Sequence, residues 1–244
     1  MPGKLTMRYL ITGASSGIGK HCAERLLRKG NECLLLARSG DKLSEIKEFY
    51  EHAHVEHVDL TDLNAVESVF DRNCQIFPFD GLIHCAGVAP LKRTDENDID
   101  TVKNAYTVNV FSFIELMRCF VQEGVCKDGS SVVAMSSVVA HRGSNRQAVY
   151  AGTKAALEAT IRCMAKELLP RRIRINAVVS ATVDTAMLQK LRTESPGLDE
   201  KIKQHSPLGI VPIDEVCDVI EYLLSDSSNH LTGASVPIDA GFFL

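Results

Sequence analysis

The sequence predicts an α/β fold in which a parallel sheet is covered by helices on both faces. Short apolar runs alternate with longer helix-like stretches along the chain, and this alternation is typical of β–α–β crossovers. The run from Cys33 to Ala37 is continuously apolar, as in a strand buried on both faces. No repeat or linker divides the 244 residues, so we expect one doubly wound domain over residues 1–244.

The elements follow one another from the first apolar run to the last. The first strand runs into a glycine-rich turn, and Gly30 closes the helix after that turn. Pro170 stops the helix after the fifth strand, because proline has no backbone donor. The strands are expected at residues 8–12, 33–37, 55–58, 80–85, 131–135, 173–179 and 234–238. The helices are expected at residues 20–29, 41–50, 62–71, about 98–123, 148–169 and 214–224.

One segment, residues 181–212, has only a weak pattern and contains Ser195-Pro196-Gly197 and Ser206-Pro207. A doubly wound sheet binds its ligand at the carboxyl ends of the strands, where the strand order reverses. A long segment beside those ends is more often a substrate lid than an idle loop. We therefore expect residues 181–212 to form the substrate loop.

Composition excludes several classes of function. The 27 basic and 31 acidic residues give a net charge of −4, which argues against a nucleic-acid or anionic-membrane protein. No window approaches the ~18 apolar residues of a membrane span. The eight cysteines are scattered and form no CxxC pair, which indicates reduced thiols and a cytoplasmic protein. His52, His54 and His57 alternate along a strand without a cysteine partner, so no metal site is expected.

The turn between the first strand and the first helix reads Thr12-Gly13-Ala14-Ser15-Ser16-Gly17-Ile18-Gly19. Its glycines allow a tight turn that brings backbone N–H groups and a helix N-terminus against a phosphate. A glycine triplet alone can be only a turn, but its place inside a β–α–β unit strengthens the prediction of a dinucleotide site.

The end of the second strand decides which dinucleotide fits. A carboxylate there would bind the ribose hydroxyls of NAD, whereas this chain has Arg38. A guanidinium can pair with a 2′-phosphate, so NADP (NADPH) is favoured; the alternative is a solvated arginine. Asp59 ends the third strand and is expected to accept from the adenine amino group or to cap a helix.

The helix that begins near Tyr150 carries the candidate chemistry. Tyr150 and Lys154 lie four residues apart, so both side chains share one helix face. The ammonium is expected to lower the pKa of the phenol, which makes Tyr150 a general acid toward a carbonyl oxygen. Ser137, at the end of the fifth strand, can donate to the same oxygen. Asn109 is expected to hold a water that links Lys154 to solvent; the alternative is a surface tyrosine and lysine.

The glycine-rich turn, Asp59, Asn109, Ser137 and Tyr150-Ala151-Gly152-Thr153-Lys154 together resemble the short-chain dehydrogenase/reductase family over essentially the whole chain. The resemblance implies a Rossmann-type fold and a catalytic tetrad of Asn109, Ser137, Tyr150 and Lys154. It also implies a cofactor site made of Gly13, Ser15, Ser16, Gly17, Ile18, Gly19, Arg38, Asp59, Leu60, Ala86, Gly87, Tyr150, Lys154, Val183 and Thr185.

Within that family the pattern is nearest to the 3-oxoacyl-[acyl-carrier-protein] reductases, with Gln147 three residues before the tyrosine. The implied function is hydride transfer between NADP(H) and a carbonyl or secondary alcohol, with a 3-oxoacyl thioester as one substrate class. The alternatives are a reductase of keto-sugars or other small ketones, a non-catalytic dinucleotide sensor, and a nucleotide-sugar epimerase or dehydratase, for which the chain leaves little room.

Family members are commonly tetramers or dimers, and two features of the sequence agree with a homo-oligomer. Ala155, Ala159 and Cys163 recur at helical spacing, which suits close packing between subunits. The apolar end, residues 241–244, is expected at a subunit interface.

The chain departs from the family pattern at three places. His84-Cys85 stands where the family has Asn-Asn, which is expected to weaken a polar network near the cofactor. Ser180-Ala181 replaces Pro-Gly and alters the nicotinamide wall. Relatives that bind acyl carrier protein carry basic residues at two positions of the docking face. Arg171 and Arg172 match one of them, but the acidic Asp128 stands at the other, so the sequence does not decide whether acyl carrier protein is a partner. His141 is expected at the substrate entrance or on the surface.

Overall fold

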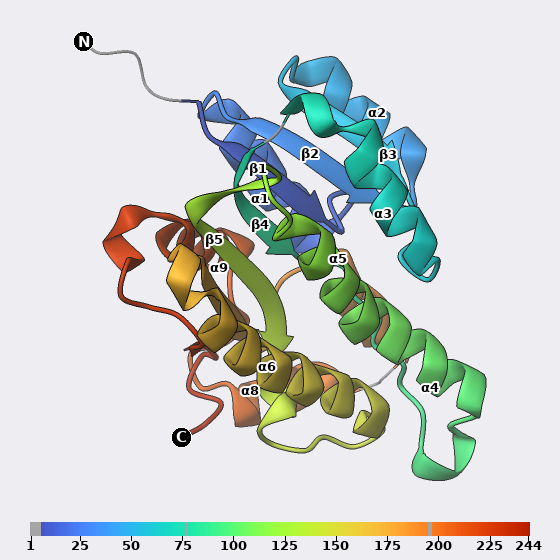
Figure 1. The fold of residues 1–244 in the computed structure, drawn as a ribbon. Coiled ribbons are helices and arrows are strands. Elements are labelled where there is room, and N and C mark those ends of the chain that lie inside the picture. Colours follow the sequence, from blue (N-terminus) through green and yellow to red (C-terminus); the bar gives the residue numbers. More distant parts are fainter. Residues whose placement is uncertain (1–5, 77, 195–196) are drawn as a thin grey trace.

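The computed structural model describes residues 6–76, 78–194 and 197–244, and in that part of the chain it contains a seven-stranded sheet (Figure 1). The strand order is β3-β2-β1-β4-β5-β6-β7, and every neighbouring pair is parallel. The strands are β1 (Arg8–Thr12), β2 (Glu32–Ala37), β3 (Ala53–His57), β4 (Phe79–His84), β5 (Cys126–Ser137), β6 (Arg174–Ser180) and β7 (Ser235–Ile238). The predicted doubly wound α/β fold is confirmed, and the strand order reverses between β1 and β4.

Nine α-helices connect or flank these strands in the described residues. They are α1 (Gly17–Arg28), α2 (Gly40–Phe49), α3 (Leu63–Arg72), α4 (Ile99–Tyr106), α5 (Ser112–Phe120), α6 (Ala148–Leu168), α7 (Ala186–Glu194), α8 (Leu198–His205) and α9 (Ile213–Leu224). Apolar residues of α3, α5 and α6 form a core on one face of the sheet. Those of α1, α2 and α9 form a second core on the other face.

Alternate residues of each strand enter the two cores, which explains why the strands are continuously apolar. Leu34 of β2 lies in the core under α3, α5 and α6, whereas its neighbour Leu35 lies in the core under α1, α2 and α9. Leu82 and Ile83 of β4 divide in the same way. Because side chains alternate across a strand, a sheet covered on both faces needs apolar residues at every position.

The structure differs from the sequence prediction in three elements. The helix expected over about 98–123 is α4 and α5 joined by a π-helical turn, Thr107–Phe111. The strand β5 begins at Cys126, five residues before the expected 131. The segment 181–212 carries α7 and α8, which the sequence did not predict because these short helices lack an extended apolar period. The singled-out Ser195-Pro196 lies outside the described residues.

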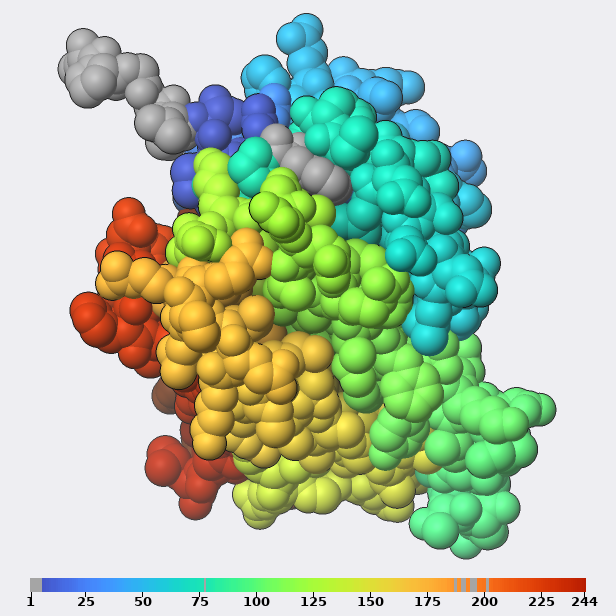
Figure 2. Space-filling model, viewed as in Figure 1, coloured from blue at the N-terminus to red at the C-terminus, as the bar shows by residue number. Residues whose placement is uncertain are grey.

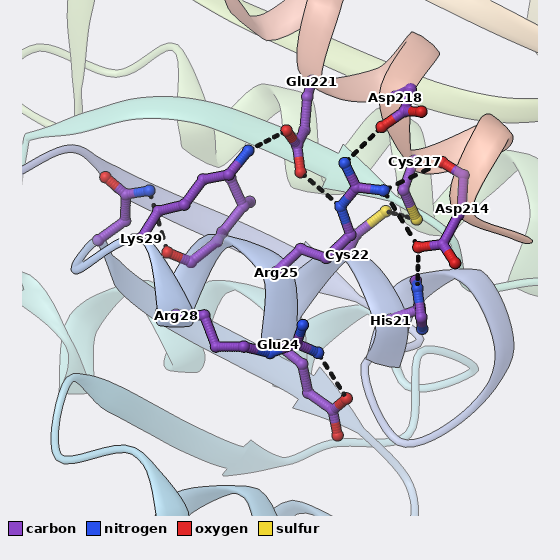
Figure 3. Close-up of polar contacts among 12 residues, drawn as sticks. His21, Cys22, Glu24, Arg25, Arg28, Lys29, Asp214, Cys217, Asp218 and Glu221 are labelled. Carbon is purple, nitrogen blue, oxygen red and sulfur yellow. Dashed lines mark hydrogen bonds and ion pairs between the residues drawn. The ribbon is translucent and has the colours of Figure 1, made fainter.

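Helices α1 and α9 lie side by side and are joined by charged side chains (Figure 3). Arg25 of α1 pairs with Asp214, Asp218 and Glu221 of α9. Beneath these charges the sulfur of Cys22 on α1 lies 2.9 Å from a sulfur of α9. This contact joins the helix that follows the glycine-rich turn to the helix that follows the segment 181–212.

Candidate active site

A cavity of about 790 Å³ lies at the carboxyl ends of the strands. Sixteen of the residues that the sequence singled out line it: Gly13, Ser15, Ser16, Gly17, Ile18, Gly19, Arg38, Asp59, Leu60, Ala86, Gly87, Ser137, Tyr150, Lys154, Val183 and Thr185. Asn109 lies behind the wall, where its Oδ1 would be 3.3 Å from a Cβ placed on Gly87. The fold thus gathers residues from distant parts of the sequence around one space.

The glycine-rich turn is packed too closely for side chains at two positions. A Cβ on Gly13, whose φ is +68°, would lie 2.8 Å from the backbone nitrogen of Ala86, and a Cβ on Gly19 would lie 2.5 Å from the Gly13 carbonyl oxygen. The Ala86 nitrogen also donates to Thr12 Oγ1 at 3.1 Å. These contacts hold the N-terminus of α1 against the cavity, and the residues present therefore fit a dinucleotide phosphate.

Arg38 and Asp59 end neighbouring strands on the β1–β3 side of the cavity. Arg38 is exposed, so its guanidinium is open to solvent and to a ligand. Asp59 Oδ1 accepts from the Thr61 nitrogen and hydroxyl, both at 2.9 Å. These bonds, helped by the charge of Arg38, hold the pKa of Asp59 below its usual value. The cap of α3 is Asp62, which accepts from two backbone nitrogens of its first turn, so the helix-cap alternative does not apply to Asp59.

Burial controls the ionisation of Tyr150 and Lys154. Lys154 is 4% exposed, its Nζ donates to the Met135 carbonyl at 2.8 Å, and burial lowers its pKa to about 8. Burial raises the pKa of Tyr150 to about 12, opposed by a hydrogen bond with Ser137. The expectation that Lys154 lowers the tyrosine pKa is therefore wrong for this structure, because desolvation of the phenolate dominates. The ammonium lies 5.7 Å from the centre of the Tyr150 ring.

Asn109 lies fully buried in the π-helical turn and joins three segments. Its Oδ1 accepts from the Val88 nitrogen at 2.8 Å, and its Nδ2 donates to the Val88 carbonyl and to Thr153 Oγ1, both at 2.9 Å. Thr153 in turn donates to the Tyr150 carbonyl at 2.7 Å. Both amide hydrogens are engaged, so a bridging water would have to use the amide oxygen.

Comparison with known proteins agrees with this geometry. Residues 13–243 match the family model described as Enoyl-(Acyl carrier protein) reductase. An L-xylulose reductase of Bos taurus is 32% identical over 238 residues, 96% of each chain. Carbonyl reductase [NADPH] 2 of Sus scrofa is 31% identical over 97% of this chain and 96% of its own. The chain belongs to the short-chain dehydrogenase/reductase family. A structure of a family member from Serratia marcescens, 26% identical, covers 100% of both chains with a TM-score of 0.89.

At the first departure from the family pattern, His84 keeps a polar link in place. It is fully buried at the end of β4, with Nδ1 2.9 Å from Thr12 Oγ1 and its ring 5.1 Å from that of Phe113. Burial, together with the charge of Lys154, lowers its pKa to about 3. Its Nε2 has no hydrogen-bond partner among the described residues. The neutral imidazole thus joins β4 to β1 through Thr12, the first residue of the glycine-rich turn, which also accepts from the Ala86 nitrogen.

At the second departure, Ser180 and Ala181 extend β6 toward the cavity. The Ala181 nitrogen donates to the Ile238 carbonyl at 3.2 Å. Val183 then pairs with Val211 in an isolated parallel bridge. The Thr185 methyl would lie 3.7 Å from a Cβ on Gly17. The start of the segment 181–212 therefore crosses the cavity and reaches the glycine-rich turn.

At the third departure, Arg171 is engaged within the chain. Its Nε lies 2.7 Å from Asp128 Oδ1, and its guanidinium also donates to the carbonyls of Val121 and Cys126 at 2.6 and 3.1 Å. Arg172 is exposed. A partner that used Arg171 would first have to displace these bonds.

Sequence reasoning missed two parts of the cavity region. Phe242 lines the cavity, although residues 241–244 were expected at a subunit interface. Glu158 is buried beside β5 and contacts His141. No local pattern signals either contact, because each one joins segments that only the fold brings together.

Proposed function

We propose that the chain is an NADP(H)-dependent reductase of small polyhydroxylated ketones, the keto-sugar class. The observation that carries the proposal is Gln147, which lines the cavity three residues before Tyr150 and whose buried Oε1 has no partner among the described residues. A buried acceptor without a donor is unfavourable, and a substrate hydroxyl would satisfy it. Ser144 and Asn145 line the same part of the cavity. The names of the L-xylulose and carbonyl reductase relatives support this class.

A bound nicotinamide supplies the hydride for the reduction. Tyr150 and Ser137 donate hydrogen bonds to the carbonyl oxygen of the substrate, and Tyr150 gives up its proton as the alcohol forms. The raised pKa keeps the phenol protonated in neutral solution, so Tyr150 meets the substrate as a proton donor. Asn109, through Thr153, fixes the helical turn that carries Tyr150.

The proposed NADP(H) preference rests on Arg38. It is the residue at the end of β2 that faces the cavity with a positive charge, and it can pair with a 2′-phosphate through two N–H donors. We further propose that the segment 181–212 forms the substrate-side wall within a single domain. Leu188, Leu198 and Ile202 of α7 and α8 line the cavity there.

A 3-oxoacyl thioester reductase is the second candidate. The apolar lining residues Leu91, Val139 and Leu198 suit an acyl chain. The engaged Arg171 disfavours docking of acyl carrier protein, so a free thioester is the better form of this candidate. A non-catalytic sensor is disfavoured because Ser137, Tyr150 and Lys154 all line the cavity.

The test is NADPH oxidation with a ketose such as L-xylulose, with a short 3-oxoacyl thioester and with a simple ketone. We expect the ketose to have the highest kcat/KM. Gln147→Leu should lower kcat/KM for the ketose by about 10–100-fold and leave the simple ketone unaffected, because only the ketose has hydroxyls to lose. Turnover of the thioester alone, or an equal loss for both ketones, would contradict the keto-sugar assignment.

We propose that the enzyme is a homodimer or homotetramer. Ala155, Ala159 and Cys163 are exposed on α6, which forms one continuous face with the green helices α4 and α5 (Figure 2). Phe111 of the π-helical turn and Ile114 of α5 add exposed apolar surface. Sedimentation at micromolar concentration should show a species larger than the 26.7 kDa chain, and a monomer alone would contradict the proposal.

We also propose a reducing compartment, the cytoplasm, because all eight cysteines are free thiols. Among the described residues, the helices include none with the length and apolar character needed to cross a membrane.

A further inference from the structure

Glu158 is a buried carboxylate one turn beyond Lys154 on α6, and the proposed reaction gives it no part. It is 2% exposed. Its Oε1 accepts from the hydroxyl of Ser136 on β5, and its Oε2 accepts from the hydroxyl of Ser235 on β7 at 2.6 Å. Nε2 of His141 lies 2.8 Å from the same Oε2. A carboxylate away from water is strongly unfavourable unless such partners satisfy it, so these three contacts fix the position of Glu158.

His141 differs from the two serines because it belongs to the loop that borders the cavity. Its side chain is 43% exposed, and it follows the short 3₁₀ turn Val138–Ala140, which continues directly from Ser137. The loop residues Val138, Val139, Arg142, Gly143, Ser144 and Asn145 line the cavity. His141 therefore anchors a cavity wall to a carboxylate inside the fold.

The same histidine contacts the C-terminal residues 241–244. Its ring meets that of Phe243 edge-on, with centroids 5.5 Å apart. Arg142 donates to the Phe242 carbonyl at 3.1 Å, and its guanidinium lies 5.5 Å from the centre of the Phe242 ring. The Asp239 carboxylate accepts from the Phe243 nitrogen at 2.9 Å, which folds the end of the chain back. Since Phe242 lines the cavity, the loop and the C-terminal residues form one wall.

We propose that His141 and Glu158 are positioning residues that hold this wall, residues 138–145 with 241–244, and that the wall sets the affinity for the carbonyl substrate. The inference rests on the proposed reductase function. The wall lies at the Ser137 end of the cavity. Arg38 and the glycine-rich turn line the other part, at the carboxyl ends of β1 and β2. Loss of the anchor should therefore change substrate binding and leave the binding of NADPH unchanged.

The test compares His141→Ala with Ser235→Ala, because each variant removes one donor from the same carboxylate oxygen. A purely structural role predicts the same result for both. We expect His141→Ala to raise KM for the ketose by about tenfold, the effect of losing one hydrogen bond to a charged group. The kcat and the Kd of NADPH should stay at their wild-type values. His141→Gln, which keeps an N–H donor, should restore KM, and Ser235→Ala should leave KM unchanged.

A second measurement needs no turnover and so separates this inference from the proposed function. In hydrogen exchange of the free protein, His141→Ala should speed exchange in residues 138–145 and 241–244, and Ser235→Ala should not. Exchange that rises equally in both variants, or a raised KM that His141→Gln fails to restore, would overturn the inference. If no ketose is turned over and only His141→Ala speeds exchange in the two segments, the anchoring role of His141 is supported and the keto-sugar assignment is wrong.

Discussion

Along the contact between α1 and α9, charged side chains pair with one another, whereas around the cavity polar groups are buried with few or no charged partners. Arg25 has three carboxylate partners, and Lys29 shares Glu221 with it (Figure 3). Lys154, by contrast, is 4% exposed and donates to a neutral carbonyl. Within the described part of the chain, Nε2 of His84 and Oε1 of Gln147 are buried and have no hydrogen-bond partner.

The charged groups between α1 and α9 stabilise the fold, whereas burial of the polar groups around the cavity lowers the free energy of unfolding. An ion-pair network at a half-exposed helix contact gains Coulomb energy at a modest desolvation cost. A lone buried ammonium or imidazole loses its hydration without an equal return, and its pKa falls as a result. Shifted pKa values of this kind are typical of functional sites. The comparison predicts that substitutions at the cavity reduce activity, and that substitutions between α1 and α9 reduce stability.

The largest expected effect is at Tyr150. Tyr150→Phe removes the proton donor and keeps the ring, so kcat should fall by about 10²–10⁴-fold, the usual contribution of a general acid. The free energy of unfolding and the Kd of NADPH should change little, because the lost hydroxyl bonds mainly to Ser137. Steady-state kinetics and cofactor titration check this. Wild-type turnover by the variant would mean that another group protonates the substrate.

Lys154 tests the cost of burial directly. Its pKa is about 8 in the folded protein against 10.5 normally, so unfolding takes up a proton between these pH values. Stability therefore rises with pH from 8 to 10.5 and is lowest where Lys154 is charged. Lys154→Met lacks this titration and should match or exceed the wild type in stability at pH 7. Between pH 8 and pH 10.5 the free energy of unfolding of the wild type should rise relative to that of the variant by up to about 3 kcal/mol.

Urea unfolding of both proteins at pH 7 and pH 10.5 measures the difference, and groups common to both cancel. Activity of Lys154→Met should be lost at either pH. A variant that is clearly less stable than the wild type at pH 7 would show that the bond to the Met135 carbonyl and the packing of the side chain outweigh desolvation.

Arg38 combines features of the two regions. It lines the cavity, but it is exposed, and its proposed charged partner is the phosphate of the ligand. A paired guanidinium and phosphate contribute about 1.5–3 kcal/mol, or roughly 10–150-fold in affinity. Arg38→Asp should reverse the preference from NADPH to NADH, since repulsion replaces attraction. Titration with both cofactors checks it, and the unfolding free energy should be unaffected. Equal wild-type dissociation constants for the two cofactors would contradict the assignment.

The sequence predicted those features that depend on local pattern. Parallel strands buried on both faces need continuous apolar runs, so Cys33 to Ala37 indicated a strand without any knowledge of its neighbours. The tight turn at Gly13 and Gly19 has no space for a side chain, so glycine marks it in the sequence. The four-residue spacing of Tyr150 and Lys154 places both on one helix face.

Features that depend on tertiary contacts were not predictable. The direction of the Tyr150 pKa shift follows from burial, and spacing alone does not report burial. Glu158 and Ser235 are separated by 77 residues, and Arg142 and Phe242 by 100, so only the folded chain brings them together. The polar helices α7 and α8 lack an apolar stripe long enough to distinguish them from a loop.

The smallest expected effect is at Arg25, where the comparison predicts a loss of stability alone. Its side chain is 17% exposed and is bound to Glu221, which is equally shielded, and to Asp214 and Asp218, which water screens. Arg25→Gln should lower the free energy of unfolding by about 1–2 kcal/mol, less at high salt. The matched control is Arg28→Gln on the same helix, because Arg28 is 56% exposed and its carboxylate partner, Glu24, is 3.6 Å away.

Urea unfolding at low and high salt should therefore separate the two arginines, while both variants keep wild-type kcat and KM. A loss of activity in Arg25→Gln at full folding would contradict the division of roles, because it would mean that the contact between α1 and α9 also positions the glycine-rich turn against the segment 181–212. Equal stability of the two variants would show that the network contributes no more than an exposed pair.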